Sequence, residues 1–376
     1  MLKVGICGGG VGGLCAAIAL LKFGHEVQVF ERVAEFGRIG ADINLTPNAV
    51  AALDGLGIGE ALRETAARPE FRISRTWDSG EETSRLPMQG GRYSAPQLTI
   101  HRADLISALD GALPEGVLRL GRSVSSVKET PQGAEIGFSD GTTESFDLVI
   151  GADGIHSVVR EALFGADHPK FTGLVSWRGV FAREKAKDIP NLDSFTKWWG
   201  PTSDLQLVVF PLLRGEEVFV FATTPLEGWN EEGWTLPGDV DELRAAYAGF
   251  HPEARALLEC LDEVTRSALH VRAPMEAWSK GNITILGDAA HPMVPFMAQG
   301  ATMAIEDGVV LALALKDATA ETVPDALAKY EEARRPRTAR VQEGSLANNW
   351  LKQPENADWV YAYKAWEVFS AGETDL

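Results

Sequence analysis

The order of apolar and polar stretches at the start of the chain predicts a strand, a helix and a second strand. Residues 3–7 form a short apolar run, residues 12–23 form a longer run ended by Gly24, and residues 26–30 form a second short run that closes at Glu31. Short apolar runs are typical of buried strands, and a run of about three turns that ends at glycine is typical of a helix. The N-terminal segment therefore predicts a β-α-β unit.

Two later apolar runs have the character of strands buried on both faces. Residues 146–150 lead into Gly151-Ala152-Asp153-Gly154. Residues 283–286 stop at Gly287-Asp288, after which a proline-containing loop leads to an apolar helix that opens near Gly300. Continuous apolar runs favour strands of a sheet that helices cover on both sides. We expect both runs to return to the lobe that the N-terminal unit begins.

The remaining patterns complete an expected α/β fold. Aromatic and β-branched residues in 171–224 predict a mostly antiparallel sheet, and Ser139–Thr142 predicts a hairpin turn. We expect an irregular excursion from the first lobe at residues 71–98. Helices are expected in residues 236–263, in residues 326–346 and in the tail to 376. We predict a Rossmann-like domain formed by residues 1–70, 97–170 and 271–325, an inserted mostly antiparallel β-sheet domain formed by 71–96 and 171–270, and a C-terminal helical region formed by 326–376.

Charge and composition narrow the class of partner. The chain has 376 residues, which is long for one hydrophobic core, and its formal net charge is −18. Nucleic acid and anionic membranes require a positive face, so we expect neither as a partner. The three cysteines lack metal-site spacing, no targeting peptide precedes the first strand, and the apolar runs are too short to span a bilayer. We expect a cytoplasmic enzyme without a metal, either a monomer or a homodimer.

A dinucleotide-binding pattern lies between the first strand and the first helix. Gly8, Gly10 and Gly13 have G-x-G-x-x-G spacing, and Glu31 ends the second strand. In this context the glycines permit a tight turn, the approach of a pyrophosphate and close helix packing, and the acid binds ribose hydroxyls. The alternative is a glycine-rich turn without a ligand, and the pattern alone does not separate NAD from FAD.

Two further acids follow predicted strands and have two interpretations each. Asp153 and Asp288 would each cap the following helix, or each would contact a cofactor. For Asp288 that contact would be with a ribityl hydroxyl.

Taken together, these three ordered motifs resemble those of single-component FAD-dependent aromatic hydroxylases, the group typified by para-hydroxybenzoate and salicylate hydroxylases. Gly8–Gly13 with Glu31 is similar to the FAD fingerprint of that family, 147–160 to its second motif for FAD and NAD(P)H, and 285–295 to its third. The resemblance covers nearly the whole chain. It implies FAD as cofactor, NADH or NADPH as reductant, and a small aromatic substrate that reacts with O2.

The resemblance also implies individual cofactor contacts. Arg38, Arg102 and Val124 stand where family members contact FAD, and Asp153 and Asp288 belong to the second and third motifs. The backbone at Gly300 and Ala301, at the expected start of a helix, would cradle the flavin ring edge and favour negative charge there.

Within the family, the chain is most similar to the 6-hydroxynicotinate 3-monooxygenases. Four segments carry this similarity: Ile100-His101-Arg102, Lys197-Trp198-Trp199, Met297-Ala298-Gln299-Gly300 and Trp359-Val360-Tyr361. Two positions depart from it, because Asn44 and Phe296 replace histidines.

We expect the substrate pocket to lie between the third-motif loop and the second-lobe sheet. Its expected lining residues are Asn44, Gln206, Val209, Phe210, Pro295 and Phe296. The sequence indicates no general base, so no catalytic residue is assigned.

The function implied by the resemblance is hydroxylation of a phenolic or pyridine carboxylate by a flavin C4a-hydroperoxide, with or without decarboxylation. One alternative is an FAD oxidoreductase of the same fold that inserts no oxygen, although the Trp-x-Trp-x-Ile-Pro pattern expected of a halogenase does not occur. The other is an NAD-binding dehydrogenase or a non-catalytic nucleotide sensor.

Three other features favour structural roles. His291 is expected to hold its loop, and Trp198 with Trp199 to join a core. Arg334, Arg335, Arg337 and Arg340 are expected to form a solvated helix face.

Overall fold

The computed structural model describes residues 1–37, 42–89, 91–229 and 236–370. Within these ranges the first lobe is built on a sheet with the strand order β18-β19-β11-β1-β2-β7. The strands are β1 (Lys3–Cys7), β2 (Glu26–Phe30), β7 (Leu118–Arg119), β11 (Leu148–Gly151), β18 (Ser279–Lys280) and β19 (Ile283–Ile285). All neighbours are parallel except β18 and β19. The sheet is therefore of the Rossmann type.

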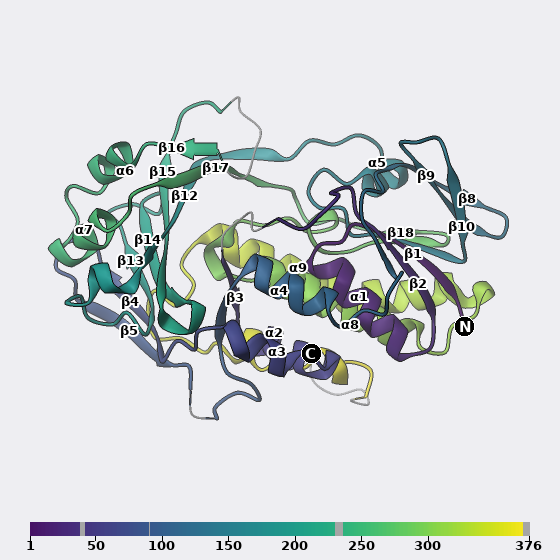
Figure 1. Ribbon diagram of the computed structural model, residues 1–376, viewed down its shortest axis with the longest axis horizontal. Helices are drawn as coiled ribbons and strands as arrows, with labels where there is room; N and C mark the ends of the chain where they lie inside the picture. The colour runs from purple at the N-terminus through teal and green to yellow at the C-terminus, as the bar shows by residue number, and fades with distance from the viewer. Residues whose placement is uncertain (38–41, 90, 230–235, 371–376) are drawn as a thin grey trace.

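Helices pack against this sheet and share the first-lobe core with its strands. They are α1 (Val11–Lys22), α2 (Pro47–Leu56), α3 (Gly59–Thr65), α4 (Arg102–Asp110), α5 (Val158–Phe164), α8 (Gly300–Leu315) and α9 (Val323–Ala347). Figure 1 shows α1, α8 and α9 lying side by side beneath the strands. A Cβ on Gly308 of α8 would lie 2.7 Å from the backbone nitrogen of Ala16 of α1, so glycine allows these two helices to pack closely.

Two small antiparallel sheets complete the first lobe. One contains β8 (Val124–Thr130), β9 (Gly133–Phe138) and β10 (Thr143–Phe146), and the other pairs β3 (Asp42–Leu45) with β6 (Leu98–His101). The short 3₁₀ helices are η1 (Arg183–Ala186), η2 (Leu213–Gly215), η3 (Gly287–Ala289), η4 (Pro295–Met297), η5 (Ala320–Thr322) and η6 (Ala365–Glu367).

The second lobe is a larger sheet with the order β16-β17-β12-β15-β14-β13-β4-β5. Its strands are β4 (Phe71–Thr76), β5 (Glu82–Pro87), β12 (Lys170–Ala182), β13 (Phe195–Trp199), β14 (Gln206–Leu212), β15 (Glu217–Pro225), β16 (Leu236–Gly238) and β17 (Val264–Val271). Pairing is antiparallel except between β13 and β4. Helices α6 (Val240–Ala246) and α7 (Pro252–Glu259) lie on the outer side of this sheet in Figure 1. Its other face, called the inner face below, contacts the first lobe.

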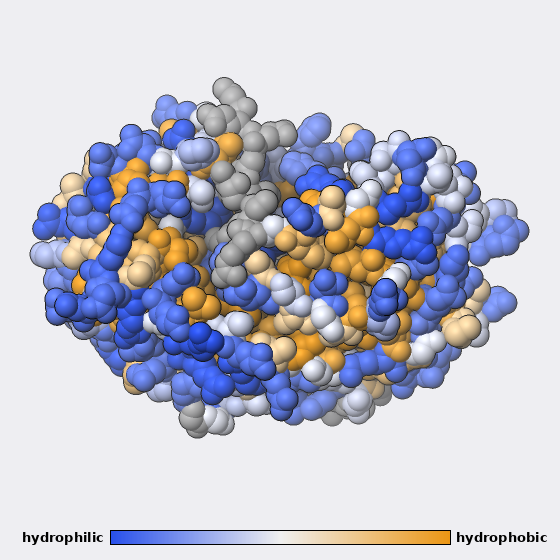
Figure 2. All heavy atoms as spheres, viewed as in Figure 1, coloured by the Kyte–Doolittle hydropathy of each residue, from blue (hydrophilic) through white to orange (hydrophobic). Residues whose placement is uncertain are grey.

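The surface differs between the periphery and the middle of the molecule. In Figure 2 hydrophilic side chains cover most of the rim of this view, while apolar side chains gather in the middle, over α1 and α4. No helix in the described residues combines the length and apolar character that crossing a bilayer would require.

Most predicted elements are present, and three expectations are wrong. Residues 71–98 are not irregular, because β4 and β5 join the second-lobe sheet. Residues 236–263 contain two short helices, since the first ends at Ala246 and Pro252 begins the second. The tail is mostly non-helical, with only α10 (Asp358–Tyr361) and η6 after α9 in the described residues. The β-α-β unit, the hairpin between β9 and β10, and the helix beginning at Gly300 are confirmed.

Candidate functional site

Four parallel strands of the first-lobe sheet end at the same edge, and each leads to a predicted site residue. β1 leads to Gly8, β2 to Glu31, β11 to Asp153 and β19 to Asp288. Neighbouring parallel strands run in one direction, so their carboxyl ends align, and this edge is where α/β sheets bind ligands. The topology thus brings a glycine turn and three acids from distant parts of the chain to one edge.

The glycine turn combines close packing with one open position. Gly8 has φ of +110°, and a Cβ there would lie 2.3 Å from the carbonyl oxygen of Ala152. A Cβ on Gly13 would lie 2.1 Å from the carbonyl oxygen of Gly8. Around a Cβ on Gly10, however, no described atom beyond its chain neighbours lies within 4 Å. The open space at Gly10 lies at the N-terminus of α1, where a pyrophosphate would fit.

Glu31 is fixed beside this turn by backbone donors. Its Oε2 accepts a hydrogen bond of 2.8 Å from the backbone N–H of Gly9, and its Oε1 accepts one of 3.1 Å from Val33. The carboxylate is half-buried at the end of β2. It therefore lies beside the turn with its position set before any ligand binds.

Asp153 makes the contacts of a helix cap, one of the two roles that the sequence allowed for it. Its carboxylate accepts hydrogen bonds from the hydroxyl of Ser157 and, at 3.2 Å, from the backbone N–H of Val159 at the start of α5. Burial raises the pKa of this carboxyl, while the bonds from Ser157 and Val159 oppose the rise. The first task of Asp153 is to order the turn that follows β11.

Asp288 has a different environment. Its side chain is exposed although Gly287 and Ala289 on either side are buried, and the surrounding protein raises its pKa, opposed by His291. The side chain thus stays exposed at the end of β19, between two buried neighbours. No described residue donates a hydrogen bond to it, so its oxygens are available to a ligand.

The loop after Asp288 is anchored through one glutamine. Gln299 donates from Nε2 to the hydroxyl of Thr46 at 2.9 Å and accepts at Oε1 from Asn48 at 3.2 Å. Gly300 and Ala301, which begin α8, are only half-buried, and Pro295 is exposed on this otherwise buried loop. The loop thus presents a fixed, partly open surface at the N-terminus of α8.

Beneath the loop lies a buried ionic network that links α8 and α9. Arg334 donates from Nε to Oδ1 of Asp307 and from Nη1 to Oε2 of Glu306, both at 2.7 Å. Arg337 donates to the two oxygens of Glu306 at 2.8 and 2.9 Å, and His291 bonds Asp307. The expectation of a solvated arginine face is therefore wrong for Arg334, which is fully buried. The prediction that His291 holds its loop is confirmed.

Two of the three predicted sheet residues lie on the inner face. Phe210 stacks on Phe195 with ring centroids 5.2 Å apart. Gln206 is four residues before Phe210 on β14, so its side chain points to the same face of the sheet. Val209 packs instead with Leu243 and Tyr247 on the outer side. Successive side chains of a strand point to opposite faces, so Val209 cannot accompany Phe210, and its expected place in the pocket is corrected. Its neighbour Val208 lies on the inner face instead, with Phe195 and Phe210.

Asn44 and Phe296, the two positions expected to depart from the 6-hydroxynicotinate 3-monooxygenase pattern, lie where the lobes meet. Asn44, on β3, accepts at Oδ1 from Gln97 at 2.8 Å, while its Nδ2 is buried without a partner. Phe296 packs with Leu269 of β17 and Val294. Both side chains are buried at the boundary between the first lobe and the inner face.

In the part of the chain that it describes, the structure shows no specific contact that would assign a cofactor role to the other three predicted cofactor residues. Arg102 is exposed as the first residue of α4, and Val124 is half-buried at the start of β8. Arg38 lies outside the described residues.

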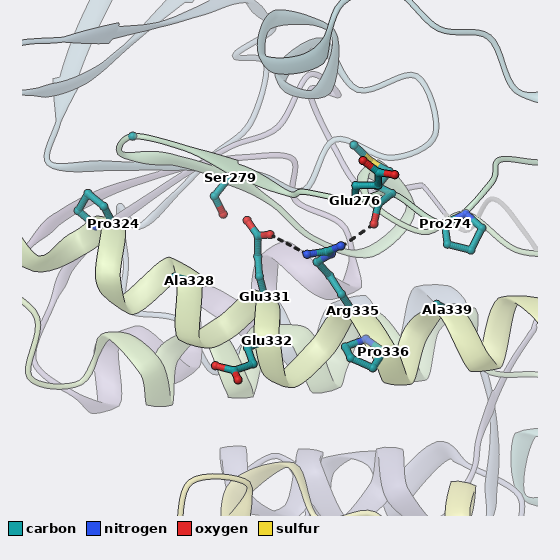
Figure 3. A pocket seen from close by; sticks show the side chains of 12 residues that line it. Pro274, Glu276, Ser279, Pro324, Ala328, Glu331, Glu332, Arg335, Pro336 and Ala339 are labelled. Atoms are coloured by element: carbon teal, nitrogen blue, oxygen red, sulfur yellow. Dashed lines mark hydrogen bonds and ion pairs between the residues drawn. The ribbon is translucent and has the colours of Figure 1, made fainter. Parts of the chain in front are cut away.

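A surface groove of about 790 Å³ lies away from these residues, between α9 and β18 (Figure 3). Arg335 within it pairs with Glu331 at 3.7 Å and donates to the carbonyl oxygen of Met275 at 3.3 Å. None of the predicted site residues lines it. The groove is therefore not the candidate site. The described residues also contain no cluster suited to a metal ion.

Sequence reasoning missed the polar residues that position the loop, namely Thr46, Asn48, Gln299, Glu306, Asp307 and Arg334. The available signal was the adjacent acid pair Glu306-Asp307 within an otherwise apolar helix. Such a pair is almost never fully buried unless basic groups compensate it.

Comparisons with known proteins agree with this geometry. The family model described as FAD binding domain matches residues 1–345. The chain is 37% identical over 370 residues to 6-hydroxynicotinate 3-monooxygenase of Pseudomonas fluorescens, covering 97% of this chain and 96% of that protein. It is 34% identical over 377 residues to salicylate hydroxylase of Pseudomonas putida, covering 92% and 84%. The structure of Klebsiella pneumoniae HpxO complexed with FAD and uric acid superposes with a TM-score of 0.81 at 26% identity, covering 98% of this chain and 93% of that one.

Proposed function

The chain belongs to the FAD binding domain family, and from this premise we propose that it is an FAD-dependent monooxygenase that hydroxylates a small phenolic or pyridine carboxylate with NAD(P)H and O2. The observation that carries the proposal is the shared strand edge, which brings together the open space at Gly10 and the unpaired carboxylate of Asp288. Relatives named for hydroxynicotinate and salicylate support an aromatic acid as the substrate.

Residues along this edge would hold FAD. The turn at Gly8, Gly10 and Gly13 would take the pyrophosphate, Glu31 the adenosine ribose, and Asp288 the ribityl chain. The remaining residues proposed to contact FAD are Arg38, Arg102, Val124, Asp153, Gly300 and Ala301. When bound, FAD supplies the redox chemistry, by accepting hydride from NAD(P)H and activating O2.

The protein's own part is to orient the ring and exclude water. Gln206 and Phe210 on the inner face, with Asn44, Pro295 and Phe296 opposite, would form the walls of the substrate pocket. The half-buried backbone of Gly300 and Ala301 begins α8, so its N–H groups would favour negative charge on the cofactor. Phe210 and Phe296 are both buried, so their rings would help to exclude water from the pocket.

Purified protein reconstituted with FAD tests the proposal. We expect a visible flavin absorbance band, and NAD(P)H consumption that an aromatic acid stimulates in a screen of phenolic and pyridine carboxylates. Hydrogen peroxide measured alongside separates hydroxylation from uncoupled oxidation. A protein that stays colourless after FAD addition would overturn the flavin assignment. NAD(P)H oxidation that yields no hydroxylated product would favour an oxidoreductase that inserts no oxygen.

A further inference from the structure

The inner face of the second-lobe sheet carries a lysine that is almost fully removed from solvent. Lys197 of β13 is 3% exposed. Its Nζ donates one hydrogen bond of 3.2 Å, to Oδ1 of Asn348 directly after α9. The same Nζ lies 3.7 Å from the ring centroid of Trp199 and 5.7 Å from that of Phe296. Lys197 therefore stands at the boundary that the proposed substrate pocket occupies.

Apart from the Asn348 acceptor, Lys197 has further cationic and donor groups nearby. Arg72 of β4 is 4% exposed, leans over the ring of Phe195 and leaves Nη1 without a partner. The indole nitrogen of Trp199 is buried and likewise unpaired. Burial lowers the pKa of Lys197 well below its usual range, and the positive charges of Arg72 and Lys352 add to the effect.

No acidic side chain of the described ranges pairs with Lys197 or Arg72. The contrast with Arg334 is direct, because this equally buried guanidinium bonds both Glu306 and Asp307. Two acids thus compensate the charge of Arg334, whereas in the described part of the chain Lys197 and Arg72 have none. A buried cation without an anion is costly, and such groups persist where a ligand supplies the missing charge.

Strand register brings these donors to one side of the sheet. Phe195 pairs with Arg72 and Trp199 with Thr76 in the parallel pair of β13 and β4. Residues two apart on a strand share a face, so Lys197 and Trp199 lie beside Phe195 and Arg72 on the inner face. The result is a patch of buried donors close to Phe296, in which Arg72 Nη1 and Trp199 Nε1 have no partner among the described residues and Lys197 donates only to Asn348.

We propose that this patch, with Lys197 at its centre and Arg72 and Trp199 beside it, binds the carboxylate of the aromatic substrate and selects acids over uncharged analogues. The inference rests on the proposed function and identifies the part of the pocket that would bind the negatively charged group of the substrate. A bound carboxylate would hold Lys197 in its ammonium form, since an opposite charge within a few ångströms favours the charged state.

Ligand titrations of the FAD-loaded protein test this, with the change in flavin absorbance as readout. Two matched pairs serve as probes: salicylate against salicylamide, and 6-hydroxynicotinate against 6-hydroxynicotinamide. In wild-type protein we expect at least one acid to bind roughly 10-fold or more tightly than its amide, as for a hydrogen bond to a charged group. An amide that binds as tightly as its acid in both pairs overturns the proposal without any variant.

Three variants then locate the effect. Lys197→Met keeps the length of the side chain and removes the charge, so the acid-to-amide ratio should fall to about one while amide binding is retained. Lys197→Arg should retain a preference for the acid. Lys170→Met, an exposed lysine of the same sheet, should leave the ratio unchanged. FAD content and thermal unfolding of each variant show that it is folded.

The outcomes separate the inference from the function on which it rests. An unchanged ratio in Lys197→Met, with normal hydroxylation, overturns the carboxylate site alone. A lower kcat for acid and amide alike, at unchanged affinities, would assign Lys197 to proton transfer and also overturn it. A flavoprotein that binds neither member of either pair, and hydroxylates no aromatic acid, overturns both.

Discussion

His291 and Asp307 share a fully buried hydrogen bond of 2.5 Å between Nε2 and Oδ2, which ties the loop after β19 to helix α8. The same carboxylate oxygen accepts the backbone N–H of Gly287 at 3.0 Å, and the other oxygen accepts Nε of Arg334. One acid thus connects α8, α9 and the turn that presents Asp288. The position of the proposed flavin contact depends on the buried network beneath it.

Asp307→Asn should destabilise the protein substantially. The substitution leaves Arg334 with only Glu306 as a compensating acid and removes the charge that faces His291. Breaking a buried ion pair by removing one partner costs about 3 to 5 kcal/mol. Urea unfolding of the apoprotein measures the loss. Asp317→Asn, an exposed acid after α8, is the control and should change stability by about 0.5 kcal/mol or less. Equal effects of the two variants would contradict the role of the network.

The contacts of Asp307 with His291 and Arg334 also predict a contribution to stability that depends on pH. Burial would raise the pKa of Asp307, but attraction and hydrogen bonds from His291 and Arg334 lower it to about 2, from 3.8. A lowered folded-state pKa contributes stability above the unfolded value, and this contribution is lost as the pH falls from about 4 to about 2. It is worth about 2 kcal/mol. The stability gap between wild type and Asp307→Asn should therefore narrow over that range, whereas a constant gap would rule this origin out.

Two glycines of the same turn should respond differently to alanine. Gly10 has φ of −76° and open space at its Cβ, so Gly10→Ala should fold normally but obstruct the approach of a pyrophosphate. We expect FAD affinity to fall by roughly 10-fold or more with little change in apoprotein stability. Gly13→Ala should lower the stability of the apoprotein itself, since its Cβ would lie 2.1 Å from the oxygen of Gly8. Unchanged FAD affinity in Gly10→Ala would argue against a phosphate at that position.

The sequence was most informative where one local pattern determines one element. Residues 4–7 form a continuous buried run and residues 26–30 bury Val27, Val29 and Phe30, as strands of a covered sheet do, and the glycine spacing fixes the turn between them. Strand order then follows from topology, so the shared edge of Gly8, Glu31, Asp153 and Asp288 could be predicted before any coordinate was known.

The sequence was less informative where tertiary contacts override local pattern. β4 carries Arg72 and Arg75 among its six residues, so it reads as polar and irregular, although the neighbouring strand buries Arg72. Val209 and Phe210 are both apolar, and alternation alone does not say which face is inner. Arg334 has the pattern of a surface residue, and its burial depends on two acids of another helix.

Asp288→Ala should weaken FAD retention without unfolding the protein. The carboxylate has no donor among the described residues, so removing it breaks no bond within the protein, but a flavin side chain would lose an acceptor. Loss of a hydrogen bond to a charged group corresponds to a roughly 10-fold or greater rise in Kd. The flavin-to-protein ratio after gel filtration, with Asp317→Ala as control, measures it. Full flavin occupancy in Asp288→Ala would show that the acid only terminates the strand.

Introducing two histidines should shift the substrate preference towards hydroxynicotinate-like rings. Asn44 has an unpaired Nδ2, and Phe296 lies within reach of Lys197, so both positions border the proposed pocket. An imidazole titrates near neutral pH and can both accept and donate a proton at a ring substituent. We expect Asn44→His with Phe296→His to raise kcat/KM on 6-hydroxynicotinate by about 10-fold or more. The ratio of product to hydrogen peroxide should rise as well, because a better-oriented ring would make hydroxylation more competitive with uncoupled formation of hydrogen peroxide. Salicylate turnover is the control and should not increase. An unchanged or lower kcat/KM on 6-hydroxynicotinate, in a variant that retains FAD, would mean that these two side chains do not face the reacting ring.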